Sequence, residues 1–373
     1  MEGINLDKEA EKIKEKVFTF TPLKIGEIKV RPVWFDSYGA KSSSIFIETP
    51  DVSVLCDPGC AGMQPGYPMA ERYRALFRKK ALETIIEFSK KADIVIITHY
   101  HYDHHVKPQE ASIIYEDKKI LMKNPNIFIN NSQWERARLF FSQLSQIYEF
   151  NFEEILNEPE KIEIEDPVEK LKSKDLDFGD YTERRKELFK KGKKWFLKLK
   201  EKWLKSQWIK EFKKERFEII FCDGKTFKFG DTEIKFTLPL FHGIEYDRIG
   251  WVVAFTLSYK GKKILYSSDL QGPQIEDYAD WIIMENPDFL TVDGPPTYLF
   301  GYMMNRTNLN RAIKNMKRII ENVKSELIIY DHHLLRDKKW RERVKEVLDY
   351  AKGKKNLITS AEWLSIRPLI DLL

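Results

Sequence analysis

Cysteine is scarce in this chain, and long apolar runs are missing. The 373 residues include three cysteines, Cys56, Cys60 and Cys222, which is an odd number without a CxxC pair. This usage argues against a disulfide scaffold and predicts a reducing, cytoplasmic environment in which each thiol is a small buried side chain. No apolar run is long enough for a transmembrane helix, and the N-terminal segment is acidic and lacks the apolar stretch of a signal peptide.

A strong excess of one charge is also missing, because the net charge is only +5. Charge alone therefore does not identify a partner. Apolar residues make up 42% of the chain and include 24 phenylalanines, which is enough to fill a sizeable core. The length suggests one large domain, or one domain that carries an insertion.

Histidine is rare as well, and its distribution gives the first functional information. All seven histidines lie in three short segments, namely His99, His101, His104 and His105 in THYHYDHH, His242 in LFHG, and His332 and His333 in YDHHLLRD. Histidine is the commonest metal ligand, because a neutral imidazole offers one lone pair while a neighbouring group holds its other nitrogen. A chain that uses histidine only in clusters is expected to bind metal.

The first cluster follows a predicted buried strand. Residues 94–97, Ile-Val-Ile-Ile, are apolar and β-branched, as in a strand that is buried on both faces. The carboxyl ends of strands are where open α/β sheets bind ligands. Four candidate ligands within six residues cannot all reach one ion, so we expect two ions side by side. His99 and His101 would face one ion, and Asp103 and His104 the other.

The pattern His99-x-His101-x-Asp103-His104 resembles the signature of the metallo-β-lactamase superfamily. Further motifs match that family in the same order, each at the end of an apolar run, and their key residues are Asp57, His242, Asp269 and His332. The segments THYHYDHH, SSDLQGP, VDGPP and DHHLLRD also resemble an uncharacterised archaeal branch of the superfamily. The resemblance implies a dinuclear metal site in which Asp269 bridges the two metals.

The resemblance also implies how seven ligands divide between the two metals. The first metal would take His99, His101, His242 and Asp269, and the second would take Asp103, His104, Asp269 and His332. His332 is preferred to His333 because it is the first residue past the strand. A buried structural histidine at position 242 and a turn aspartate at position 269 are the alternatives. Four further residues are expected to support the ligands or to face the substrate: Asp57, His105, His333 and Tyr298.

Two stretches with a β pattern, each followed by helices, predict the architecture. Strands are expected within 25–33, 44–48 and 52–55, with helices at about 1–17 and 70–91. Further strands are expected within 226–228, 233–237, 251–259, 263–266, 289–292, 327–330 and 357–359, with helices at about 308–323 and 337–351. Two sheets packed face to face with helices outside give an α/β fold. This is the four-layer αβ/βα sandwich that the resemblance implies.

Residues 133–217 are predicted to be a helical insertion within a single domain, 1–373. Roughly 130 residues separate His104 from His242, which is more than two or three crossovers need. The part 183–216 carries fifteen Lys or Arg against five Glu, a net charge of +10. Trp195, Trp203 and Trp208 recur there and are expected to pack the helix down rather than stack on bases. We expect the insertion to form a lid or arm beside the metal site.

These features predict a metal-dependent hydrolase. Two ions about 3.5–4 Å apart would lower the pKa of a bridging water to near neutrality, and the hydroxide would attack a carbonyl carbon or a phosphorus. Asp103 is expected to orient that hydroxide and carry its proton. Zinc suits the imidazole ligands, and the carboxylates also admit manganese or iron.

The substrate is predicted less closely than the reaction. The leading candidate substrate is a phosphodiester or another anionic ester, either in a small molecule or in a nucleic acid. A thioester or lactone hydrolase is the alternative enzyme, and a non-catalytic nucleic-acid-binding metalloprotein is the alternative of another class. The sequence does not determine the oligomeric state.

Overall fold

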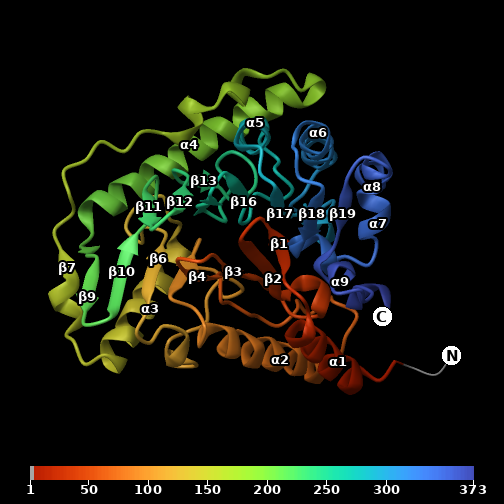
Figure 1. The fold of residues 1–373 in the computed structure, drawn as a ribbon. Coiled ribbons are helices and arrows are strands. Elements are labelled where there is room, and N and C mark those ends of the chain that lie inside the picture. The colour runs from red at the N-terminus through yellow and green to blue at the C-terminus, as the bar shows by residue number, and fades with distance from the viewer. Residues whose placement is uncertain (1–3) are drawn as a thin grey trace.

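Two mixed β-sheets form the centre of the computed structural model, which describes residues 4–373 (Figure 1). The first sheet has eight strands in the order β1-β2-β3-β4-β5-β6-β10-β9. Their bounds are β1 (Leu23–Ile25), β2 (Ile28–Phe35), β3 (Ser43–Glu48), β4 (Ser53–Cys56), β5 (Ile94–Ile97), β6 (Lys119–Met122), β10 (Phe217–Phe221) and β9 (Phe212–Lys214). Strands β4, β5, β6 and β10 run parallel, so their carboxyl ends share one edge.

The second sheet has seven strands in the order β11-β12-β15-β16-β17-β18-β19. Their bounds are β11 (Thr226–Phe229), β12 (Thr232–Phe236), β15 (Phe255–Tyr259), β16 (Lys262–Tyr266), β17 (Phe289–Asp293), β18 (Leu327–Asp331) and β19 (Asn356–Ile358). Strands β16 to β19 are parallel. The short hairpin β13 (Leu240–Phe241) and β14 (Trp251–Val252) forms a separate two-stranded sheet.

Helices cover the outer face of each sheet (Figure 1). Below the first sheet in that view are α1 (Leu6–Thr19), α2 (Glu71–Ser89) and α3 (Asn131–Ile147). Beyond the second sheet are α5 (Glu276–Glu285), α6 (Arg306–Asn322), α7 (Trp340–Arg343) and α8 (Lys345–Ala351), while α9 (Ser360–Trp363) lies near the C-terminus. The four-layer αβ/βα sandwich predicted from the sequence is confirmed.

The buried faces follow from residue spacing. In α1 the buried side chains are Leu6, Ala10, Ile13 and Val17, a stripe three and four residues apart that faces the protein. The predicted residues 1–3 of this helix lie outside the described part of the chain. All four residues of β5 are buried, as expected for a strand covered on both faces. This rigid strand leads directly into the first histidine cluster.

Three predicted elements are wrong in detail. The strand expected within 25–33 divides into β1 and β2, and β2 continues to Phe35 past a bulge between Pro32 and Trp34 that accommodates a residue lacking an N–H group. The strand expected over 251–259 divides into β14 and β15, which pair with different partners. The last long helix divides into α7 and α8 around Val344, whose ψ of 21° departs from helical values.

The segment predicted as a helical insertion is helical only in part. It contains α3 and α4 (Thr182–Lys205), but the stretch between them is made of short 3₁₀ turns, irregular chain and the short strand β7 (Leu156–Asn157). Strands β8 (Trp208–Ile209), which pairs with β7, and β9 follow α4. The predicted packing of the tryptophans is confirmed. Trp203 and Trp208 are buried, and the ring of Trp195 stacks on Trp251 with centroids 5.4 Å apart.

The described helices include none that is both long and apolar enough to cross a membrane. The three cysteines are buried free thiols, as predicted.

Candidate metal centre

The predicted ligands follow the carboxyl ends of strands from both sheets. His99, His101, Asp103 and His104 come after β5, Asp269 comes after β16, His332 and His333 come after β18, and His242 comes after β13. Parallel strands bring their carboxyl ends to one edge, and the two sheets face each other there. Residues more than two hundred positions apart in the sequence therefore meet in one buried cluster.

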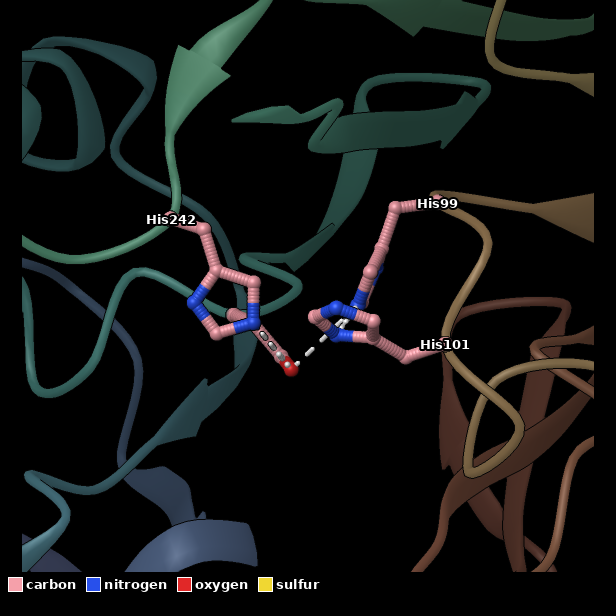
Figure 2. Close-up of side chains that lie close together, drawn as sticks. His99, His101 and His242 are labelled. Atoms are coloured by element: carbon pink, nitrogen blue, oxygen red, sulfur yellow. Dashed lines mark hydrogen bonds and ion pairs between the residues drawn. The ribbon is translucent and has the colours of Figure 1, made fainter. Parts of the chain in front are cut away.

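The first ligand group consists of His99, His101, His242 and Asp269. One candidate ligand atom from each residue lies within 4.8 Å of all the others. Figure 2 shows the rings of His99, His101 and His242 converging on one point. Nε2 of His99 lies 3.0 Å from Nδ1 of His101, and Nε2 of His242 lies 3.1 Å from Oδ2 of Asp269. Ligands bound to one tetrahedral zinc at about 2.0–2.1 Å are themselves about 3.3 Å apart, so these spacings fit a shared ion.

The second ligand group consists of Asp103, His104 and His332. Nε2 of His104 lies 3.3 Å from Nε2 of His332, which in turn lies 3.8 Å from Oδ2 of Asp103. Asp269 adjoins this group too, since its Oδ2 lies 3.1 Å from Nε2 of His104 and its Oδ1 lies 3.5 Å from Nε2 of His332. The structure thus places the predicted bridging aspartate between the two groups.

His333 also faces this point, which leaves the choice between the paired histidines open. Asp269, His332 and His333 form a third group of candidate ligand atoms, with Nε2 of His333 3.6 Å from Oδ2 of Asp269. Both histidines have positive φ angles, 45° for His332 and 21° for His333. Such angles are strained for residues with a side chain, and here they turn two successive rings towards the same cluster.

Three carboxylates hold the far nitrogens of the inner histidines. Nδ1 of His104 lies 2.8 Å from Asp57, Nδ1 of His332 lies 3.0 Å from Asp36, and Nδ1 of His333 lies 3.2 Å from Asp293. A carboxylate that accepts from one ring nitrogen leaves the other free as a lone pair and fixes the orientation of the ring. This arrangement is typical of histidines that bind metal.

The loop that carries Asp57 requires glycine at position 59. A Cβ atom built on Gly59 would lie 2.2 Å from the backbone nitrogen of His104, a distance that no real Cβ contact tolerates. The side chain of Asp57 also accepts from the backbone N–H and the hydroxyl of Thr98, at 2.8 and 2.7 Å. Close approach of the two loops is what brings Asp57 within reach of His104.

The electrostatics of the cluster call for cations. Six buried carboxylates gather here: Asp36, Asp57, Asp103, Asp269, Asp293 and Asp331. Burial raises the pKa of Asp269, but His104, His332 and His333 outweigh burial and hold it well below its usual range. Burial lowers the pKa of His332, but Asp36 and Asp269 raise it to about 10. Without metal, a protonated imidazole balances the charge of the carboxylates. A bound divalent ion would displace that proton and supply the positive charge in its place.

Other features of the cluster match a metal site in the same way. Both carboxylate oxygens of Asp269 and Nε2 of His242 are buried and have no hydrogen-bond partner within residues 4–373. Burial, and after it the neighbouring histidines, hold the pKa of His99 and His101 well below the usual range, which keeps their lone pairs free. Buried polar atoms without partners are costly, and metal coordination would satisfy them. The donor set of imidazoles and carboxylates suits zinc, manganese or iron.

Of the residues predicted to support the site, His105 lies away from the ligand groups and Tyr298 lies near the second one. His105 lies outside the ligand groups: its ring packs edge-on against Phe140 with centroids 5.4 Å apart, and its Nδ1 lies 3.3 Å from the carbonyl oxygen of Val106. Tyr298 is half-buried near the second group, and the guanidinium of Arg336 lies 5.9 Å from its ring centroid.

Sequence reasoning missed Arg336 and Asp36. The buried guanidinium of Arg336 donates to Asp36 through Nε at 2.5 Å and to Asp103 through Nη2 at 2.9 Å. Burial raises the pKa of Asp103, but Arg336 and the histidines His104, His332 and His101 together outweigh burial and hold it well below its usual range. The only available signal was the position of Arg336 four residues after His332, within DHHLLRD. Asp36 follows β2, and no motif marks it.

The sheet topology and the strand ends that carry the ligands define the class of protein. The chain has the metallo-β-lactamase fold, with a His/Asp cluster that suits metal binding at the expected edge of the sandwich. No family model matches the sequence. It is 32% identical over 350 residues to a UPF0282 protein of Methanopyrus kandleri, covering 90% of this chain and 94% of that one. Identity to a UPF0282 protein of Methanocaldococcus jannaschii is 32% over 353 residues, with coverage of 90% and 94%. The chain belongs to the UPF0282 family.

Solved structures similar to this one include metallo-β-lactamase fold proteins at low sequence identity. YhfI from Bacillus subtilis has a TM-score of 0.43 and 13% identity, covering 89% of this chain and 95% of that chain. The short form of human tRNase Z has a TM-score of 0.37 and 13% identity, with coverage of 78% and 85%. Zinc-bound PqqB from Methylobacterium extorquens has a TM-score of 0.38 and 10% identity, with coverage of 85% for both chains. The assignment of the fold therefore rests on the topology described above.

Proposed function

We propose that this protein is a dinuclear metal-dependent hydrolase of an anionic ester, with phosphodiesters as the leading substrate class. The observation that carries the proposal is the position of Asp269. Its two oxygens are buried, have no hydrogen-bond partner within residues 4–373, and face both ligand groups. A carboxylate in that position suits a bridge between two ions.

The proposed ligand set keeps the division predicted from the sequence. His99, His101 and His242 would hold the first ion, and Asp103, His104 and His332 the second, with Asp269 shared. Two divalent ions held there would lower the pKa of a bound water and stabilise negative charge that develops on the substrate. Zinc is the proposed metal, with manganese and iron as the alternatives.

The chain's own residues would divide the remaining work. Asp57 and Asp36 keep His104 and His332 in one tautomer and one orientation by accepting from Nδ1. Arg336 and the neighbouring histidines keep the pKa of Asp103 low, which suits this carboxylate to bind an ion and to accept a hydrogen bond from the nucleophile. His333 points at the same space, with Asp293 behind its Nδ1, and would donate to the substrate or take a place among the ligands.

Two assays test the proposal. Metal analysis of the purified protein should give about two ions per chain. The metal-loaded protein should hydrolyse bis(p-nitrophenyl) phosphate, and its rate should rise through one deprotonation between about pH 6 and 8. Hydrolysis of p-nitrophenyl acetate or of a thioester in the absence of phosphodiester hydrolysis would favour the alternative enzyme. Two bound ions with no hydrolysis of any of these substrates would favour the non-catalytic alternative.

A nucleic-acid substrate and a cytoplasmic location are part of the same proposal. Helix α4 carries exposed lysines, which would favour an anionic substrate. The helix is attached close to His242, because Arg185 on α4 pairs at 2.8 Å with Glu245, three residues after His242. The basic helix is therefore held beside a loop of the metal centre.

A further inference from the structure

Lys41 sits on a fixed piece of backbone next to the second ligand group. Its backbone N–H donates to the carbonyl of Ala61 at 2.9 Å, and its carbonyl accepts from the N–H of Ala61 at 2.9 Å. The following residue, Ser42, donates its N–H to Asp36 at 2.9 Å and accepts from Nδ1 of His332 at 3.1 Å. The side chain of Lys41 therefore begins one residue away from the groups that orient His332.

The ammonium group of Lys41 has no partner in the described part of the chain. Its Nζ makes no hydrogen bond or ion pair within residues 4–373, although the side chain is half-buried. Burial and the nearby Arg336 lower the pKa of Lys41, while Asp103 and Asp36 raise it, so all three groups lie within its electrostatic range. The two carboxylates are already bound by Arg336 through Nε and Nη2.

Arg336 also carries a donor atom without a partner in the described structure. Its Nη1 makes no hydrogen bond within residues 4–373, whereas Nε and Nη2 are both occupied. The half-buried ring of Tyr298 lies 5.9 Å from the guanidinium. Partial burial of a cation that lacks a counter-charge is unfavourable, and a ligand that brings its own negative charge offsets that cost.

We propose that Lys41 and the Nη1 edge of Arg336 form an oxyanion subsite beside the second ligand group. It would bind a compact anionic group of the substrate, a phosphate or a carboxylate, next to the ester that is cleaved. Lysine supplies a point charge, and the planar guanidinium supplies directed donors for a second oxygen. The inference rests on the proposed function, since the subsite serves a substrate that is cleaved at the adjacent metal centre.

The subsite narrows the substrate class. The substrate would carry a second anionic group, a phosphate or a carboxylate, beside the ester that is cleaved. The anion must also lie on the side of Asp103, because Arg336 is anchored to that residue at 2.9 Å.

Anion binding to the zinc-loaded protein tests the subsite directly. Calorimetric titration with inorganic phosphate should give an affinity that Lys41→Met weakens at least about tenfold, that is about 1.4 kcal/mol. Lys41→Arg should retain most of the affinity. Lys118→Met is the matched control, since Lys118 is also buried without an ion pair in the described structure, but it precedes β6 at the opposite end of the sheet. All variants should keep the wild-type metal content.

An unchanged phosphate affinity in Lys41→Met would overturn the subsite, because the anion would then be held by the metals alone. A parallel titration with acetate separates the two anion sources: Lys41-dependent binding of acetate as well as phosphate identifies a carboxylate-tolerant subsite, and dependence for phosphate alone identifies a phosphate subsite. These titrations involve no turnover. Lys41-dependent binding in a protein that hydrolyses no ester would contradict the hydrolase and leave the subsite supported. Hydrolysis with equal KM for charged and neutral esters in wild type and Lys41→Met would overturn only the subsite.

Discussion

Asp36 and His332 are 296 positions apart, yet Oδ1 of Asp36 lies 3.0 Å from Nδ1 of His332. Asp36 begins the 3₁₀ turn that follows β2 in the first sheet, and His332 follows β18 in the second. The contact therefore joins the two halves of the sandwich and determines which nitrogen of His332 faces Asp269. Together with the carbonyl of Ser42, which lies 3.1 Å from the same nitrogen, this contact lets the first half of the sandwich orient a residue of the second.

Asp36→Ala should selectively weaken binding of the second metal ion. Loss of the carboxylate behind a metal-binding histidine typically costs about 10–100-fold in metal affinity. We expect the variant to retain one ion and to lose the other at limiting metal, as measured by metal analysis after dialysis. Asp93→Ala is the control, since Asp93 accepts from Ser53 at the far end of β5. Retention of both ions by Asp36→Ala would contradict the role given to this contact.

Asp269→Ala and His101→Ala should differ in how much metal they lose. Asp269 adjoins both ligand groups, whereas His101 belongs only to the first. The aspartate variant should therefore lose most of both ions, and the histidine variant only one of them. Equal metal content in the two variants would show that Asp269 is not a bridge.

Gly59→Ala should disturb the metal centre without touching a ligand. Its methyl group would meet the backbone of His104 at 2.2 Å, and overpacking of this kind costs about 1–3 kcal/mol. We expect a lower midpoint of thermal unfolding and a lower affinity for the second metal ion. Gly62→Ala is a matched control in the same loop, because nothing lies within 4 Å of its added Cβ. Identical melting curves for the two variants would argue against the close approach.

The ion pairs of Glu245 should make the attachment of α4 sensitive to acid. Glu245 contacts Arg185 at 2.8 Å and Arg311 at 2.7 Å. Burial raises the pKa of Glu245, but Arg311 and Arg185 outweigh burial and hold it below 4.5. A depressed pKa in the folded protein means that this stabilisation is complete above about pH 4.5 and is lost as the pH falls through the lower folded value.

Glu245→Gln should therefore lose about 3 kcal/mol of unfolding free energy at neutral pH, and the difference from wild type should shrink below about pH 4.5. Urea denaturation at several pH values measures both effects. Glu201→Gln breaks an exposed pair with Lys205 and should cost less than about 1 kcal/mol. A pH-independent difference would rule out the linkage.

Charge reversal on α4 should reveal whether the basic helix binds nucleic acid. Lys193 is paired with Glu169 at 2.9 Å and Lys202 donates to Asn131 at 2.8 Å, so Lys194 and Lys198 are the better targets. Lys194→Glu with Lys198→Glu should weaken binding of single-stranded RNA and flatten its dependence on salt. Binding that is undetectable at low salt in the wild-type protein would leave α4 as a structural element.

The sequence predicts the parts of this fold that depend on local pattern. The apolar run of β5 predicts a buried strand, and the spacing within HxHxDH predicts two ligand groups. Asp36 and Arg336 could not be found in that way, because their importance arises from contacts across about 300 positions. The close approach of the two loops at Gly59 could not be predicted from local pattern for the same reason. Pro32 interrupts the pairing of β2 with β3 by a bulge, as its missing N–H group predicts, but the continuation of β2 to Phe35 depends on tertiary pairing with β3.

The separation of the ligands along the chain has a consequence for biosynthesis. His104 and His332, whose Nε2 atoms lie 3.3 Å apart, are 228 residues apart in the sequence. A ribosome releases the HxHxDH segment long before β16 and β18 exist, so the growing chain offers a metal only a few mobile histidines. With the proposed ligand assignment, tight and selective metal loading would wait until the second sheet has folded against the first. A product that terminates before β18 would keep the signature motif and lack one of the ligands proposed for the second ion.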